Sequence, residues 1–338
     1  MSSSINTNAI DAVTEGINRI GILDSEIQIC ANCGKEGSDV TNTCNKCKSV
    51  MYCNAACKKK HRKKHKKECE ENVKRAAEHA AKVHDEKLFK QPPPNEDCPI
   101  CMIRLPTLLG RTYMACCGKV ICTGCVYAFQ SRAFKARKDQ LCPFCRTPPP
   151  NSNEEEIERL EKRIELNDAY AIYQLGIYYA GGKYELPRDV AKALELWHRA
   201  GELGCSDAYY NIAHSYNGNG MERNMKKAQH YWELAAIGGS IEARNNLGVR
   251  EGQATYMNLG AMEAQLGNFE KAVKHFMIAT KDGDTKSLKN IKAFYSQLGL
   301  ATKDDYAKAL QSYKAYVDEI KTDQRDEAAA YDDNNKYY

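Results

Sequence analysis

Eight cysteines fall within 48 residues between positions 98 and 145, and their spacing is the strongest constraint on how this chain folds. Three pairs have two residues between their members and a fourth pair is adjacent; the pairs are Cys98 and Cys101, Cys116 and Cys117, Cys122 and Cys125, and Cys142 and Cys145. A tight turn that holds two thiolates supplies half of a tetrahedral zinc shell, so four pairs can complete two shells. Triple-proline runs at 92–94 and 148–150 border this stretch.

The distribution of the cysteines favours zinc over disulfides. Fifteen of the sixteen lie between Cys30 and Cys145. A dense, even cysteine count is also typical of a secreted disulfide framework. However, the first residues (MSSSINTNAIDAVTEG) have neither the basic region nor the apolar core of a signal peptide. No run of about 18 apolar residues is present either. We therefore expect an intracellular protein, in the cytoplasm or the nucleus, whose paired cysteines bind metal.

The net charge does not indicate a nucleic-acid-binding surface over the whole molecule. The formal charge is +5. Fifteen thiolates bring fifteen negative charges and four zinc ions bring eight positive ones, so the charge of the loaded protein falls to about −2. We therefore expect proteins or peptides as partners, and neither nucleic acid nor membrane.

A second cluster of candidate ligands begins at Cys30. It contains seven cysteines and one histidine in the order Cys30, Cys33, Cys44, Cys47, Cys53, Cys57, His65 and Cys69. Over about 40 residues this order and spacing resemble the MYND zinc finger family, including the tyrosine before Cys53. The resemblance implies two interleaved zinc sites, one of Cys30, Cys33, Cys53 and Cys57 and the other of Cys44, Cys47, His65 and Cys69. His61 is a second candidate imidazole, but its spacing fits less well, and we expect it at the surface.

The segment between Cys57 and Cys69 is strongly basic, with Lys or Arg at eight of the ten positions 58–67. We interpret this run as the solvated face of a helix. A nuclear-import signal is the second interpretation. DNA binding is the weakest, because no aromatic residues or recognition-helix pattern accompany the charge. The MYND family binds short proline-containing peptides, so the resemblance implies a peptide partner, although Lys58 and Arg62 stand where the family usually has glutamine and tryptophan.

The central cluster resembles the RING finger family along its whole length. Lys119 stands where the family usually has a histidine ligand, and an ammonium group has no lone pair to offer a metal. Cys116 is the natural substitute, and Gly118 can adopt the unusual backbone angle that adjacent ligands require. The resemblance then implies one zinc at Cys98, Cys101, Cys122 and Cys125 and another at Cys116, Cys117, Cys142 and Cys145. We expect four zinc ions in total, two for each finger.

RING fingers recruit a ubiquitin-conjugating enzyme through a hydrophobic groove, and three residues match that role by position. Ile100 lies inside the first cysteine pair, Phe129 lies four residues after Cys125, and Arg146 follows the last ligand. The alternative is that Ile100 and Phe129 cap a small core and that Arg146 is an ordinary surface residue. A ligase of this type has no catalytic nucleophile of its own, because it acts by orienting the charged thioester.

The second half of the chain carries a repeated motif in which a Lys-Ala pair precedes an aromatic residue. The pairs are Lys192-Ala193, Lys227-Ala228, Lys271-Ala272 and Lys308-Ala309, with spacings of 35, 44 and 37 residues. The pattern resembles Sel-one-like repeats, which are tetratricopeptide-related helix pairs, over residues 168 to about 320. Small residues would let the helices of a pair approach closely, and the aromatic residues would fill the core. We expect Cys205 to be buried.

The long spacing of 44 residues has a visible cause in the sequence. Asn246-Leu-Gly recurs twelve residues later as Asn258-Leu-Gly, and we expect this partial duplication to lengthen a helix or a loop.

These patterns predict a mostly α protein, an α-helical repeat solenoid preceded by two small cross-braced zinc-finger modules. The expected parts are a disordered lead (1–28), a MYND-type finger (29–70), a helical linker (71–96), a RING-like finger (97–150), Sel-one-like repeats (151–322) and a flexible tail (323–338). The function that we expect is a zinc-binding intracellular adaptor that mediates protein–protein interactions. The alternative is a RING-type ubiquitin ligase whose repeats or MYND-type finger select the substrate, so we leave open whether the protein is an enzyme.

Overall fold

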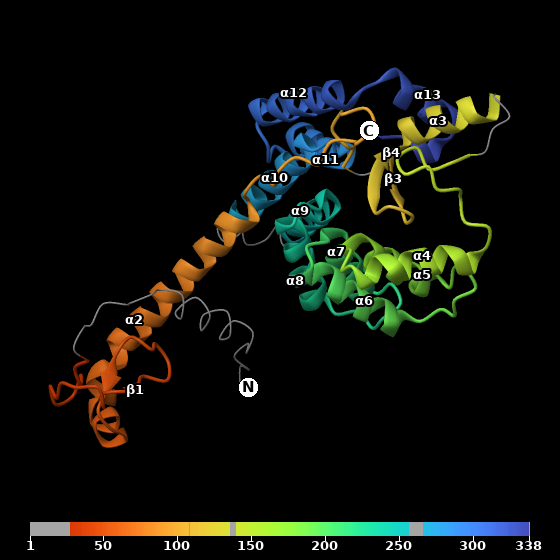
Figure 1. Cartoon of the computed structure of the whole chain (residues 1–338). Helices are drawn as coiled ribbons and strands as arrows, with labels where there is room; N and C mark the ends of the chain where they lie inside the picture. Colours follow the sequence, from red (N-terminus) through yellow and green to blue (C-terminus); the bar gives the residue numbers. More distant parts are fainter. Residues whose placement is uncertain (1–27, 108, 136–139, 257–265, 338) are drawn as a thin grey trace. The chain divides into compact units, whose positions relative to one another are not determined.

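The computed structural model describes residues 28–107, 109–135, 140–256 and 266–337. The chain divides after Leu88 into two compact units, which we call the finger unit and the repeat unit (Figure 1). Among the described helices, none combines the length and the apolar character that a membrane span requires.

The finger unit consists of a small hairpin and one long helix. Strand β1 (Asn42–Thr43) pairs antiparallel with β2 (Met51–Tyr52), and helix α2 (Ala55–Leu88) follows for 34 residues. The helix is long because it is rich in alanine and in long charged side chains and contains neither Gly nor Pro. The second half of the finger and residues 71–88 of the expected helical linker are therefore one continuous element, whereas residues 89–96 of that linker are not helical.

The repeat unit begins at Phe89 and includes the segment predicted to be RING-like (residues 97–150), which we call the RING-like module. Strand β3 (Arg111–Met114) pairs antiparallel with β4 (Lys119–Cys122), and helix α3 (Thr123–Lys135) begins directly after β4. Its core is small, with Leu105 and Ile121 buried among cysteine side chains. A core of this size cannot stabilise a module alone, so the fold of this part depends on metal and on its neighbours.

Helices account for the rest of the repeat unit. After α4 (Asn153–Glu165) come four antiparallel pairs: α5 (Ala169–Gly181) with α6 (Val190–Glu202), α7 (Ser206–Tyr216) with α8 (Met225–Ile237), α9 (Ile241–Tyr256) with α10 (Leu266–Lys281), and α11 (Thr285–Ala293) with α12 (Lys303–Ile320). A π-helical turn (Phe294–Leu298) extends α11, and α13 (Asp323–Tyr331) and a short 3-10 turn (Asp333–Asn335) end the chain. The predicted fold class is confirmed.

The repeated motif forms the core of this solenoid. The alanine of each Lys-Ala pair is fully buried, at Ala193, Ala228, Ala272 and Ala309. Trp197 shows how an aromatic residue fills the space between the paired helices α5 and α6. Its indole lies so close to Gly176 of α5 that a Cβ there would collide with it. The indole N–H also donates to the carbonyl of Tyr173 at 3.3 Å. Small residues are thus required where paired helices meet.

Three stretches of the chain either differ from the expectation from sequence or lie outside the described residues. Residues 323–338 are expected from sequence to form a flexible tail, but Asp323–Tyr331 form α13, with Arg325 fully buried and Tyr337 2% exposed. Burial of these two residues against the rest of the unit explains the difference. The duplicated segment after Tyr256 and most of the N-terminal lead lie outside the described residues, so the expectations for them stay predictions.

Candidate metal centres

Four groups of ligand atoms converge in the described part of the chain, two in each unit. Within each group the ligand atoms all lie within 4.8 Å of one another. The groups in the finger unit are Cys30, Cys33, Cys53 and Cys57, and Cys44, Cys47, His65 and Cys69. Because the two sets alternate along the chain, neither site can order without the other, and metal binding is coupled to the folding of the whole finger.

The distances between these atoms fit zinc and exclude disulfides. The sulfur atoms of Cys33 and Cys53 are 3.7 Å apart, and those of Cys44 and Cys69 are also 3.7 Å apart. Ligands at zinc–sulfur distances of about 2.3 Å lie about 3.8 Å apart in a tetrahedron, whereas a disulfide bond is about 2.05 Å long. All sixteen cysteines lie in the described ranges and are free thiols. Zinc would therefore supply the cross-links that hold each finger together.

The structure brings His65, and not His61, to the second finger site. Nε2 of His65 lies 3.2 Å from the sulfur of Cys47, while Nδ1 faces Glu68 at 3.2 Å. A carboxylate on the second ring nitrogen orients a histidine ligand. His61 instead forms a 3.2 Å hydrogen bond to the hydroxyl of Tyr52, so it helps to position the finger from outside the ligand group.

The RING-like module holds the other two groups. They are Cys98, Cys101, Cys122 and Cys125, and Cys116, Cys117, Cys142 and Cys145. The sulfur atoms of Cys101 and Cys122 are 3.9 Å apart, and those of Cys116 and Cys145 are 3.4 Å apart. Lys119 lies outside both groups, with its ammonium 5.8 Å from the centre of the Phe144 ring. Cys116, and not Lys119, therefore belongs to the second group.

The turn between these adjacent ligands and β4 depends on a glycine. Gly118 has a φ of 69°, a left-handed conformation that glycine adopts without strain. A Cβ at this position would also collide with the guanidinium of Arg163 on α4. The second zinc group of the module is thus packed directly against the first helix of the solenoid.

The three residues expected to contact a conjugating enzyme all lie on the RING-like module. The guanidinium of Arg146 lies 5.0 Å from the centre of the Phe129 ring, so the structure brings these two together. Ile100 projects from the loop of the first group and is 42% exposed. The sequence analysis missed Phe144, which is 44% exposed between the paired ligands Cys142 and Cys145. Its position between two paired cysteines could have predicted this exposure, because both cysteine side chains point toward the metal site and the residues between them point toward solvent.

Helix α3 presents its two sides to different surroundings. On one side α13 covers it: Tyr127 packs on Tyr331, with ring centres 5.2 Å apart, and Arg325 lies against Gly124. Phe129 is two residues beyond Tyr127, and therefore about 160° away around the helix. The C-terminal helix thus leaves the side that carries Phe129 and Arg146 uncovered.

Both ends of the solenoid hold the RING-like module. At the first repeat, the hydroxyl of Tyr113 donates to Asp168 at 2.8 Å. At the last helices, Arg104 forms a 2.8 Å ion pair with Glu319, and buried Arg325 donates to the carbonyl of Ile103 at 3.3 Å. Figure 1 shows β3 and β4 between the α4–α5 and α12–α13 ends. The module therefore bridges the first and the last repeat.

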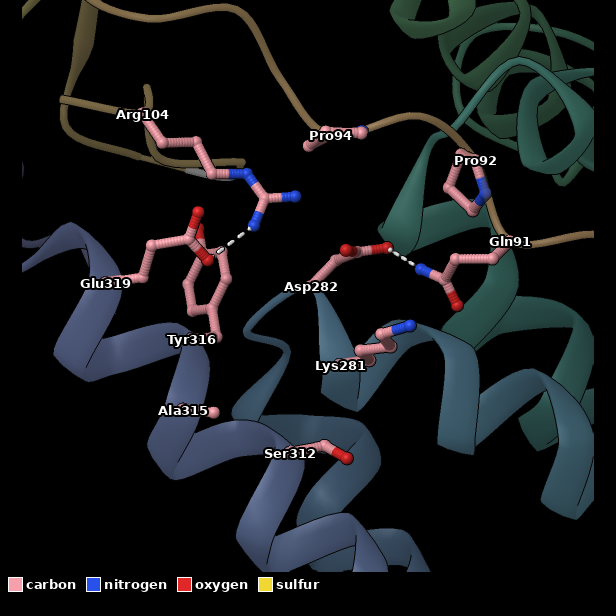
Figure 2. Close-up of a pocket in the computed structure, with 10 residues that line it drawn as sticks. All are labelled: Gln91, Pro92, Pro94, Arg104, Lys281, Asp282, Ser312, Ala315, Tyr316 and Glu319. Atoms are coloured by element: carbon pink, nitrogen blue, oxygen red, sulfur yellow. Dashed lines mark hydrogen bonds and ion pairs between the residues drawn. The ribbon is translucent and has the colours of Figure 1, made fainter. Parts of the chain in front are cut away.

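In the described part of the chain, two cavities border turns between helices of the solenoid. The first, of about 350 Å³, lies beside α12 and is lined by Arg104, Asp282, Ser312 and Glu319 among others (Figure 2). The second, of about 290 Å³, lies beside the α6–α7 and α8–α9 turns. Burial raises the pKa of Asp282 above its usual range. Charged side chains therefore line surfaces that are only partly open to water.

Buried groups near these turns have strongly shifted pKa values. Burial, with the negative charge of Asp207, raises the pKa of Glu242 to about 7. Burial also raises the pKa of Cys205 to about 12, and this thiol is 8% exposed, so it is a core residue and not a reactive one.

Comparisons with known proteins identify two of the modules. A family model for the MYND finger matches residues 30–69, and the model for the Sel1 repeat matches residues 169–205 and 206–240. The chain thus contains a MYND finger and Sel1 repeats. No curated protein matches the chain. These modules make it a zinc-binding protein with protein-interaction domains.

Several solved structures resemble part of the chain. A Sel1 repeat protein from Oxalobacter formigenes is 27% identical with a TM-score of 0.40, and the match covers 49% of this chain and 64% of that protein. A protective antigen of uropathogenic Escherichia coli with an SLR fold is 22% identical with a TM-score of 0.37, covering 54% and 43%. The immunity protein Pa5087 from Pseudomonas aeruginosa is 18% identical with a TM-score of 0.33, covering 61% and 68%. The chain thus spans just under two thirds of the first of these proteins.

Proposed function

We propose that this protein is an intracellular adaptor that binds one partner through its MYND finger and another through its repeat unit. The observation that carries the proposal is the division of the chain into two compact units, each with its own interaction module. The RING-like module is tied to both ends of the solenoid, so in this proposal it sets the shape of the repeat surface.

The test is affinity capture from cell extract with the native chain and two variants. Cys44→Ser removes a ligand of the finger, and Ser312→Arg places a large charged side chain in the cavity beside α12. The adaptor predicts two sets of captured proteins, one lost with each variant. It also predicts that members of both sets elute together only from the native chain. A single set, or one lost with both variants, contradicts the proposal.

A second candidate function is supported by the uncovered side of α3. Ile100 is exposed, and Arg146 lies on Phe129 on the side that α13 leaves open. A hydrophobic residue and a cation at these positions are what a RING-type ubiquitin ligase needs to hold a conjugating enzyme and to restrain the attached ubiquitin. Catalysis would then consist of orientation, worth several orders of magnitude in rate without a nucleophile on this chain.

The test of the second candidate is discharge of ubiquitin from a panel of charged conjugating enzymes. A ligase predicts discharge by the native chain and at least ten-fold slower discharge by Ile100→Ala and Arg146→Ala. The matched control is Leu203→Ala, which removes a similarly exposed side chain (45%) from the solenoid and should change nothing. Absence of discharge with every enzyme, from protein that contains its zinc, overturns the ligase and leaves the adaptor.

The basic run on α2 supports a nuclear address. Lys63, Lys64, Lys66 and Lys67 are all exposed on the helix surface. Import through this run predicts that a fluorescent fusion of the chain concentrates in nuclei, and that replacing these four lysines with glutamine redistributes it to the cytoplasm. An unchanged distribution contradicts the proposal.

A further inference from the structure

Residues 89–92 run along the solenoid and contact helices α9 and α10 and the turns beside them. The Phe89 ring packs on His275 of α10, with ring centres 4.7 Å apart, and the carbonyl of Lys90 accepts a 3.1 Å hydrogen bond from Arg244 of α9. The side chain of Gln91 donates to Asp282 in the α10–α11 turn at 2.9 Å, as Figure 2 shows. Pro92 then lies against the α8–α9 turn at Gly239. Four successive residues thus contact four different parts of the repeat array.

The sequence of this segment fixes its extended form. Proline locks its own φ near −65° and directs the residue before it to extended angles. Gln91, Pro92 and Pro93 each precede a proline, so the segment is already close to a polyproline II helix before it contacts the repeats. A segment of this kind loses little conformational entropy on binding. Its three prolines also carry no backbone N–H groups that would need acceptors in the groove.

The solenoid supplies equivalent positions along the path of the segment. The turns that join successive helices present short polar or glycine-containing stretches to it, at residues 204–207, 238–240 and 282–284. All three turns contribute residues to the second cavity beside Pro92–Pro94, and Asp282 also borders the first. The segment therefore occupies a groove made from one turn per repeat, and it leaves open volume on both sides.

We propose that this groove is a binding site for extended proline-rich peptides with an aromatic residue three positions before the first proline and an amide directly before it, and that residues 89–94 fill it in cis. The inference rests on the proposed adaptor function, because it names the ligand class of the repeat unit. A tethered segment acts at an effective concentration on the order of millimolar. A partner peptide therefore binds only if its affinity and concentration are high enough to displace the tethered segment from the groove.

The test uses the full chain and a labelled peptide of residues 86–97 (EKLFKQPPPNED), with binding followed by fluorescence anisotropy. In the variant Phe89→Ala/Gln91→Ala, the internal segment loses its ring contact and its side-chain hydrogen bond. We expect the peptide to bind this variant at least ten-fold more tightly than the native chain. A control peptide that carries the same two substitutions should bind the double variant at least ten-fold more weakly than the native peptide does.

Two further variants locate the site. Adding Asp282→Ala to the double variant removes the acceptor for the glutamine and should weaken binding at least five-fold. Adding Cys44→Ser disrupts the MYND finger and should leave binding unchanged, whereas loss of binding would place the peptide on the finger and overturn the inference. If the double variant does not fold, Gln91→Ala alone should still show about three-fold tighter binding than the native chain.

Equal binding by native and weakened chains overturns the inference, since the segment would then be a packed linker without a site beneath it. That result leaves the adaptor standing if the two captured sets are still found. Conversely, peptide binding without captured sets supports the groove and contradicts the adaptor, so the two failures are distinguishable.

Discussion

The hydroxyl of Tyr113, on the first strand of the RING-like module, donates a 2.8 Å hydrogen bond to the carboxylate of Asp168, which caps the first helix of the first repeat. The same carboxylate accepts from Arg163 at 2.9 Å and from the backbone N–H of Tyr170 at 3.1 Å. One side chain therefore joins the zinc module, helix α4 and the start of α5.

Replacing Asp168 tests this junction. Asp168→Ala should destabilise the repeat unit by roughly 2–4 kcal/mol, because it removes a helix cap, an ion pair and a hydrogen bond together. Tyr113→Phe should cost about 1 kcal/mol. The matched control is Asp189→Ala, which removes an exposed cap of α6 that bonds only within its own turn and should cost about 1 kcal/mol. Denaturant unfolding measures all three, and equal costs for the two aspartates would contradict the shared role.

Zinc removal should affect the two units differently. We expect native mass spectrometry to find four zinc ions per chain, as the four ligand groups imply. Cys142→Ser should lower the melting temperature of the repeats by roughly 5–10 °C, because the RING-like module bridges the two ends of the solenoid. Cys44→Ser, the control, should disorder the finger and leave that temperature unchanged. Identical melting of both variants would contradict the bridge.

The turn at Gly118 should not tolerate a side chain. Gly118→Ala combines a left-handed backbone angle with a collision against Arg163, and should cost roughly 2–4 kcal/mol of unfolding free energy. Gly299 is the matched control, since its φ of 65° is similar but a Cβ there would meet open space. Gly299→Ala should therefore cost only the backbone strain, about 1–2 kcal/mol. Equal costs would show that the contact with α4 does not matter.

Glu242 should make the stability of the repeat unit depend on pH. Its pKa is raised to about 7 in the folded chain, above the unfolded value of about 4.3. The folded state therefore binds the proton more tightly, so the stability from this group is present at low pH and is lost as the pH rises from about 4 to 7. Glu242→Gln should raise the unfolding free energy by roughly 1–3 kcal/mol at pH 8 and by much less at pH 5. An equal gain at both pH values would contradict this cause.

Much of the fold follows from local patterns in the sequence. The alanines and aromatic residues of the repeats recur at fixed offsets, and burial of Ala193 and Trp197 follows from helical periodicity. The substitution of Cys116 for a histidine follows from chemistry, because lysine cannot ligate zinc at neutral pH. In these cases the physical requirement and the residues that meet it lie close together in the chain.

Other features depend on residues far apart in the chain. Arg325 lies in a polar segment that resembles a frayed end, but it is fully buried and donates both to the carbonyl of Ile320 nearby and to that of Ile103, more than two hundred residues away. The groove that holds Pro92 is likewise made by turns more than a hundred residues away. Contacts between residues so far apart in the chain leave no periodic pattern in the sequence. The local composition of these segments therefore suggests only a disordered tail or a linker.

The bridge across the two ends of the solenoid limits how the repeat array can change during evolution. An open array gains or loses repeats at little cost, because each repeat contacts only its neighbours. Here a duplicated or deleted helix pair would shift Glu319 and Arg325 away from Arg104 and Ile103. The last helices would then lose their contacts with the zinc module. The copy number of the repeats is therefore tied to the geometry of a zinc-bound module encoded before them.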